Sequence, residues 1–179
     1  MITGHSNRAH LITDRKEFKE DQVHFADQVA DVYEGNIVGP YSILLHSPDL
    51  ASRIVNTASY VRFESTLPKV VYKLAVLTAT RELNCNYAWQ IHHETAINEG
   101  VREGALAAIR DRRAPQDLMA DEECIVRYVQ ELLRNNRISD KTFKAVRDNF
   151  TIQQMVDLTV TIGHYGTLAA VLNAFEVDP

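Results

Sequence analysis

Apolar residues recur along this chain at spacings of three and four, which is the period of an amphipathic α-helix. The first such stretch covers residues 15–34 and ends before Gly35, with apolar positions at Phe18, Val23, Phe25, Val29 and Val32. A loop containing glycine and proline is predicted from Gly35 to Ser47. The pattern therefore predicts an N-terminal helix followed by a turn.

Two start signals follow this loop. Ser47-Pro48 places serine at the N-cap and proline at the first helical position. The helix it opens is predicted to stop near Glu64, with the inward positions Leu50, Ile54, Ala58 and Val61. A second start at 65–68 leads into an apolar run over residues 70–78.

The later part of the chain is also helical in pattern. A helix is predicted over 85–98, ending at Gly100, and shorter helices over 101–112, 121–135 and 139–148, with Asp121 and Ser139-Asp140 as caps. The last helix, 151–175, is apolar on more than one face, which is typical of burial, often by oligomerisation. No alternating strand pattern occurs, so the fold class is all-α.

Residues 158–175 carry no formal charge and are almost long enough to cross a membrane. They contain threonine, glycine, His164, Tyr165 and Asn173, which are too polar for a helix that faces lipid. We therefore expect a buried or subunit-interface helix and no membrane partner.

Composition limits the other classes of protein. The chain has 179 residues, 45% hydrophobic and 24% charged, which suits one soluble globular domain. A net charge of -5 without a basic stripe argues against a nucleic-acid partner. Two cysteines make no disulfide framework and no apolar leader is present, so we expect a cytoplasmic protein.

The candidate chemistry is concentrated in residues 84–92. On a helix, Cys85, Trp89 and His92 share one face. Cys85 lies near the helix start, where the dipole favours a thiolate, and the alternative is an inert buried thiol. His92 is expected to titrate near neutrality and to act in acid–base chemistry, with a core histidine as the alternative. Trp89 is a pocket wall or a core residue.

Further candidates are polar groups elsewhere. His164 and Tyr165 lie between two glycines in an apolar helix and need partners. Arg81 is a candidate anion anchor, with Lys73, Arg53 and Arg62 as alternatives, and each can equally be a surface charge. Neither a metal-ligand spacing nor a phosphate- or dinucleotide-binding motif occurs, so no metal and no cofactor is expected.

The pattern Arg-Glu-x-Asn-Cys-x-Tyr-x-Trp-x-x-His over residues 81–92 resembles the carboxymuconolactone decarboxylase-like family, in the alkylhydroperoxidase D-like superfamily. Further matching segments occur at 39–40, 44–48, 60–65, 67–68, 138–143 and 163–174. The resemblance implies an alkylhydroperoxidase D-like helical fold, a homo-oligomer (trimer or hexamer) and a pocket around the Cys/His helix. It assigns 35–179 to this domain and leaves 1–34 as a helical extension.

The family resemblance implies two chemistries, decarboxylation of 4-carboxymuconolactone and thiol peroxidase activity with a Cys-x-x-Cys pair. This chain has Ala88 in place of the second cysteine and Lys73 where an upstream glutamate would fall. We therefore predict a cofactor-free lyase for a small carboxylic acid or lactone, with His92 as acid/base, Cys85 or Tyr165 assisting and Arg81 as anchor. The alternatives are a one-cysteine peroxidase using Cys85 and a non-catalytic oligomer.

Overall fold

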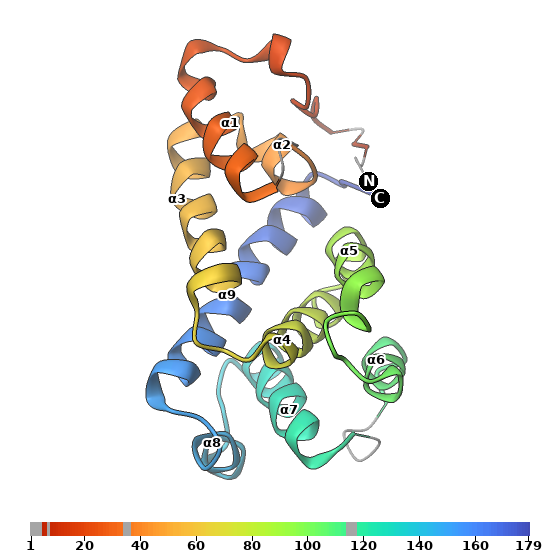
Figure 1. The fold of residues 1–179 in the computed structure, drawn as a ribbon. Coiled ribbons are helices and arrows are strands. Elements are labelled where there is room, and N and C mark those ends of the chain that lie inside the picture. Colours follow the sequence, from red (N-terminus) through yellow and green to blue (C-terminus); the bar gives the residue numbers. More distant parts are fainter. Residues whose placement is uncertain (1–4, 7, 34–36, 114–117) are drawn as a thin grey trace.

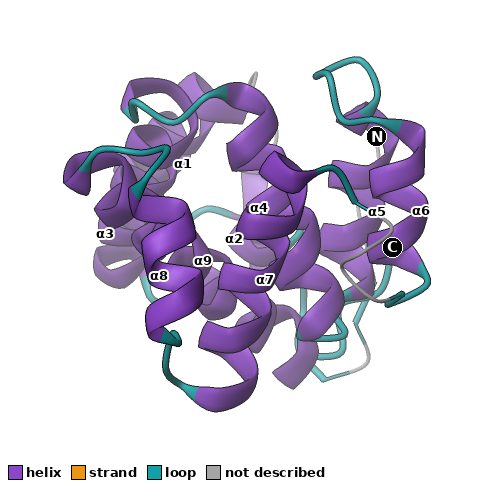
Figure 2. Ribbon diagram, turned by 90° about the horizontal axis from the view of Figure 1, so that it is seen from below, coloured by secondary structure: helices purple, strands orange, loops and turns teal. Residues whose placement is uncertain are grey.

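The computed structural model describes residues 5–6, 8–33, 37–113 and 118–179. Over these ranges the chain is helical and forms no strand (Figure 2). An isolated backbone pairing of His5 with Asp178 joins the first described residues to the C-terminal segment. The predicted all-α fold class is confirmed. In chain order the α-helices are α1 (Glu20–Tyr33), α2 (Pro40–Leu44), α3 (Pro48–Ser59), α4 (Lys69–Glu82), α5 (Asn86–Ala96), α6 (Glu103–Arg110), α7 (Ala120–Asn135), α8 (Asp140–Arg147) and α9 (Ile152–Ala174).

Helix α4 forms the centre of the fold and packs against α5, α6, α7 and α9 (Figure 1). All residues from Lys73 to Thr80 are buried, because neighbouring helices enclose this part of α4 on every side. Thr78 and Thr80 satisfy their hydroxyls by donating to the carbonyls of Leu74 and Leu77, at 2.7 and 3.1 Å. Lys73 is therefore the one charged side chain in an otherwise neutral run.

The N-terminal helix α1 packs on α3 through Phe25 and Val29, which lie one turn apart. It begins later than predicted, because residues 15–17 form a short 3-10 turn and Phe18 is extended. Val23 is exposed, since burial of Phe25 and Val29 turns it to the solvent. The side chain of Val32 lies outside the described residues. The division at residue 34 stays a prediction.

The predicted loop before Ser47 contains the short helix α2. Gly39 precedes it at a φ of 57°, and Pro40 takes the first helical position. A side chain at Gly39 would lie 2.5 Å from the Tyr87 ring, so the glycine permits α2 to approach α5 closely. Residues 35 and 36, the start of the predicted loop, lie outside the described residues, as does residue 34, the end of the predicted helix.

Helix α3 begins at Pro48 as predicted and continues into a π-helical segment, η2 (Tyr60–Glu64), which ends at the predicted place. The backbone N–H of Ser65 donates to the Tyr60 carbonyl at 2.8 Å, the five-residue spacing of a π-turn. Leu50 is exposed, because the buried face of α3 is formed by Ala51, Val55 and Ala58. The inward prediction was wrong for Leu50.

The connections after α5 follow the start and stop signals closely. Gly100, at a φ of 92°, lies in the turn that ends the α5 region. Ser139 caps α8 by accepting from the Thr142 N–H at 3.3 Å. The predicted cap at Asp121 is wrong, since α7 begins at Ala120 and the Glu122 carboxylate accepts from the Met119 N–H at 2.9 Å.

Helix α9 crosses the molecule and contacts α2, α3, α4 and α8 (Figure 1). By length and composition it is long and apolar enough to span a membrane, but 56% of its apolar window is buried in the fold, as in the core helix of a soluble protein. Its solvent face nevertheless carries exposed Ile152, Val156 and Val160. The expected homo-oligomer stays a prediction.

Candidate functional site

A cavity of about 290 Å³ lies between α2, η2, α5 and α9. Its walls are mainly apolar and aromatic, formed by Val38, Pro40, Tyr41, Tyr87, Ala88, Ile91, Leu168 and Leu172. Polar groups reach it from η2, α5 and α9: Arg62, His92, Glu94, Thr95 and Tyr165. An apolar cavity with a few converging polar groups is the usual form of a small-molecule site.

His92 lines the cavity from the middle of α5 and is partly buried. Its Nδ1 lies 3.3 Å from the Lys73 Nζ, and its ring meets the Tyr165 ring edge-to-face at 5.1 Å. Burial lowers the pKa of His92 well below its usual value, and the positive charges of Lys73 and Arg62 lower it further. The prediction that His92 titrates near neutrality is therefore wrong, and the ring is neutral at pH 7.

Lys73 lies beneath the cavity with only 3% of its surface exposed. Its ammonium forms an ion pair with the Glu99 carboxylate at 2.9 Å and donates to the Thr95 hydroxyl at 2.9 Å. Burial lowers the pKa of Lys73, while the Glu99 carboxylate raises it. The sequence marked Lys73 as a departure from the family pattern, but its contact with His92 joins two helices and was not predictable from spacing.

His164 and Tyr165 follow each other on α9 and face different surroundings. Tyr165 lines the cavity, and its hydroxyl lies 2.6 Å from the hydroxyl of Tyr72 on α4. His164 is buried beside a separate shallow pocket that includes Arg53. Burial lowers the pKa of His164 to about 4, with a smaller effect from Arg62. Only Tyr165 of this pair reaches the cavity.

Cys85 is the N-cap residue of α5 and does not line the cavity. It is 1% exposed and belongs to an apolar cluster with Ile43, Ala169 and Leu172. Burial raises the pKa of the Cys85 thiol, and the Ala88 backbone amide opposes this only in part. The predicted lowering of this pKa by the helix N-terminus is wrong, because the loss of solvation outweighs the dipole.

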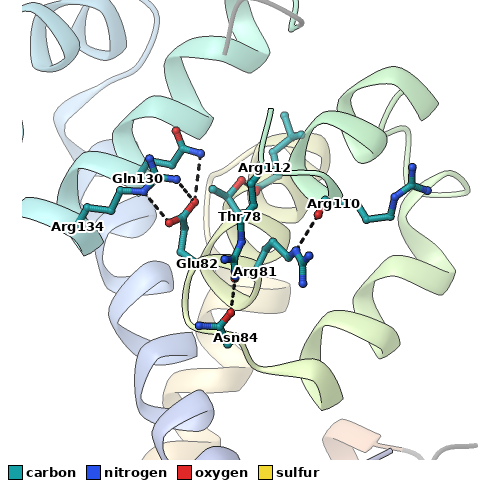
Figure 3. Close-up of polar contacts among 9 residues, drawn as sticks. Thr78, Arg81, Glu82, Asn84, Arg110, Arg112, Gln130 and Arg134 are labelled. Carbon is teal, nitrogen blue, oxygen red and sulfur yellow. Dashed lines mark hydrogen bonds and ion pairs between the residues drawn. The ribbon is translucent and has the colours of Figure 1, made fainter. Parts of the chain in front are cut away.

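Arg81 and Trp89 contact each other outside the cavity. The Arg81 guanidinium lies 5.7 Å from the centre of the Trp89 ring, and its Nε donates to the Arg110 carbonyl at 2.8 Å. Figure 3 shows this side chain directed at the end of α6, while neighbouring Glu82 holds Arg134 on α7. In this structure Arg81 and Trp89 therefore join helices and lie away from the polar groups of the cavity.

Arg62 brings the positive charge that does reach the cavity. Its segment η2 is held by the buried Asp157 on α9, which accepts from the hydroxyls of Tyr60 and Ser65 at 3.1 and 3.2 Å and from the Thr66 N–H at 3.2 Å. Sequence analysis gave Arg62 only as an alternative anion anchor, because the π-turn that directs it has no clear sequence signal. The Asp157 contacts fix the place from which Arg62 extends.

Over the described ranges, no group of three or more His, Cys, Asp or Glu side chains lies close enough together to hold a metal ion. Among the polar groups of the cavity, the Arg62 guanidinium is a donor only and is suited to an anion rather than to a metal, while the Glu94 carboxylate is an acceptor only. The expected absence of a metal or cofactor stays a prediction.

The sequence and the fold were compared with known proteins. Residues 48–131 match the Carboxymuconolactone decarboxylase family, a narrower region than the predicted domain. No protein of curated function matches the sequence significantly. The family match is limited to residues 48–131, and the solved structures below share the fold of this chain.

The similar structures share the fold at low sequence identity. An alkylhydroperoxidase AhpD core protein from Ralstonia eutropha JMP134, an uncharacterized peroxidase-related protein, is 15% identical with a TM-score of 0.74, over 96% of this chain and 94% of that one. A variant of the debrominase Bmp8 in complex with 2,3,4-tribromopyrrole is 10% identical with a TM-score of 0.75, over 97% and 93%. A putative antioxidant defence protein AhpD from Agrobacterium tumefaciens is 18% identical with a TM-score of 0.63, over 75% and 92%.

Proposed function

We propose that this protein is a cofactor-free lyase that removes CO2 from a small carboxylic acid or lactone bound in the cavity. The observation that carries the proposal is the convergence of Arg62 and His92 on one mainly apolar cavity. Arg62 supplies a fixed cation for an anionic substrate, and His92 supplies a ring nitrogen for proton transfer.

The chemistry needs three events. The bond between the carbon skeleton and the leaving carboxylate breaks, and its electron pair moves onto a conjugated carbonyl of the substrate as CO2 departs. A proton from His92 then forms the new C–H bond. Arg62 holds a second carboxylate or the developing enolate oxygen, and Tyr165, whose ring contacts His92 and lines the cavity, donates to the same oxygen. The apolar walls strengthen these charge interactions by excluding water.

The surroundings of the two cysteines favour this reaction over thiol chemistry. A peroxidase needs a thiolate that peroxide can reach. Cys85 lies in an apolar cluster outside the cavity with a raised pKa, and burial likewise raises the pKa of Cys124. At the position where a second active cysteine would stand, Ala88 lines the cavity. We therefore rank the one-cysteine peroxidase below the lyase.

The size and lining of the cavity indicate the class of substrate. About 290 Å³ with aromatic walls suits a compact ring rather than a chain. A protein with this fold forms a complex with a tribromopyrrole, another small planar ring. We propose a carboxylated ring or lactone as substrate and the reducing cytosol as the place of action.

The proposal is tested by screening small carboxylic acids and carboxylated lactones for CO2 release, with and without a thiol reductant. Turnover independent of reductant, and abolished in His92→Gln, is the expected result. Absence of CO2 release together with peroxide consumption that Cys85→Ser abolishes would overturn the proposal in favour of the peroxidase. Peroxide consumption that persists in Cys85→Ser would not involve this thiol.

A further inference from the structure

We infer that Lys73 is a positioning residue that holds His92 as the neutral tautomer with its proton on Nε2, and that Lys73 replaces the proton that His92 delivers. The tautomer is an inference from geometry alone. The part concerning proton replacement rests on the proposed lyase function.

The three donors of the Lys73 ammonium have three acceptors. Glu99 Oε1 and Thr95 Oγ1 each lie 2.9 Å from Nζ, and His92 Nδ1 lies at 3.3 Å. An ammonium has donors only, so the ring nitrogen that faces it must be the unprotonated acceptor. A neutral imidazole carries one N–H, which is therefore on Nε2.

The charges around His92 keep the ring neutral. Lys73 on α4 and Arg62 on η2 are cations, while Tyr165 on α9 presents an uncharged phenol ring. The Glu99 carboxylate forms an ion pair with the Lys73 ammonium. Its negative charge therefore stabilises the charged form of Lys73 rather than a protonated His92 ring. Glu94 on α5 lines the cavity but is exposed. Protonation of His92 would place three positive charges together.

A neutral imidazole is a poor acid unless its other nitrogen gains a proton at the same time. In the proposed step, the Nε2 proton moves to the substrate carbanion while an ammonium proton of Lys73 moves to Nδ1. The ring stays neutral with its proton on Nδ1, and Lys73 becomes an amine. The Nδ1 proton then returns to the Lys73 amine, and Nε2, which faces the cavity, takes a proton from water; this restores the ammonium and the Nε2–H form and completes the proton balance.

The residue at position 73 thus determines the direction of proton transfer. A carboxylate there would accept from Nδ1–H and leave Nε2 as a base. An ammonium instead leaves Nε2 as the donor. Lys73, which stands where the family resemblance places a glutamate, therefore converts His92 from proton acceptor to proton donor.

The test is nitrogen NMR of the protein labelled with 15N-histidine, with the His92 signals identified by their loss in His92→Gln. In the wild type at pH 7 we expect a protonated Nε2 and an unprotonated Nδ1. Lys73→Met should raise the pKa of His92, because one nearby cation is removed. It should also mix the two tautomers. Lys69→Met, an exposed lysine on the same helix, should leave the His92 signals unchanged.

A second variant keeps the test decisive if Lys73→Met folds poorly. Lys73→Glu combined with Glu99→Gln replaces the ammonium by a carboxylate without placing two carboxylates together. This variant should move the His92 proton to Nδ1. A protonated Nδ1 or a cationic ring in the wild type, or His92 signals unchanged in every Lys73 variant, would overturn the inference.

The catalytic part has a separate readout. Lys73→Met should lower kcat for CO2 release by about 100-fold with a small change in KM, and Lys73→Arg should restore part of it. If the NMR result holds but no acid releases CO2, the proposed function fails while the tautomer assignment stands. If CO2 release is unaffected by Lys73→Met, the proton relay is wrong while the lyase function stands.

Discussion

The two ends of the Cys85–His92 segment differ in what surrounds them. Cys85 caps α5 within an apolar cluster, and burial raises the pKa of its thiol. His92, seven residues later, lines the cavity and contacts Lys73 and Tyr165. Both residue types are common in active sites. This difference shows that access to the cavity and the neighbouring polar groups, rather than residue type, decide which side chain can react.

The largest expected effect comes from replacing His92, the proposed proton donor. His92→Gln keeps a polar side chain of similar size but cannot relay a proton. We expect kcat for CO2 release to fall by about 10²- to 10⁴-fold, with substrate affinity little changed. Steady-state kinetics and direct binding measure the two effects separately. An unchanged kcat would remove His92 from the chemistry.

The burial of the histidines should be visible in the pH dependence of stability. The pKa of His164 is lowered to about 4, while an unfolded histidine titrates near 6.5. Between these values the unfolded chain binds a proton that the folded protein does not. Stability present above pH 6.5 is therefore lost as the pH falls to about 4, by on the order of 3 kcal/mol.

Urea unfolding between pH 7 and pH 4 measures this loss. His164→Gln should flatten the dependence, and His92→Gln should do so in the same direction, since its pKa is lowered as well. A slope that is identical in the wild type and in the His164 variant would contradict the burial of this ring.

Replacement of Arg62 tests the proposed anion site of the cavity. Arg62→Met should weaken binding of a carboxylate ligand by about 10- to 100-fold, the range for losing a hydrogen-bonded charge. Arg53→Met, on α3 and exposed beside the other pocket, is the matched comparison and should leave affinity unchanged. Isothermal titration with one carboxylic acid ligand measures both. Equal loss in the two variants would indicate a general charge effect.

The smallest effect is expected at Cys85. Cys85→Ala should lower stability by about 1 kcal/mol through lost packing and leave CO2 release within about 2-fold of the wild type. Cys124→Ala, at the second buried thiol, should behave in the same way. A large loss of activity in Cys85→Ala alone would indicate that the thiol takes part in the reaction. The contrast between Cys85 and His92 would then not hold.

The sequence predicted the helices well because their start signals are local. Pro48 and the Ser139 cap lie where the pattern placed them. The exposed position of Leu50 was missed, since apolar spacing alone does not fix which neighbouring positions turn inward. Helix α2 was missed because five residues are too few to show a period.

The site was predictable only in part. Two of the candidate residues, His92 and Tyr165, line the cavity, while Cys85, Arg81, Trp89 and His164 lie outside its lining. Spacing reports which residues share a helix face, and the decisive contacts here join different helices. The Lys73–His92 contact joins α4 and α5. The position of Arg62 depends on the hydrogen bonds that Asp157 on α9 accepts from the residues around η2.

The direction in which Arg62 points depends on the number of residues in the π-turn η2. Such a turn holds one residue more than the α-helical turn it replaces. Loss of one residue between Ser59 and Arg62 would turn the guanidinium about 100° around the helix axis. A single lost codon, rather than a series of substitutions, would then remove the positive charge of Arg62 from the cavity.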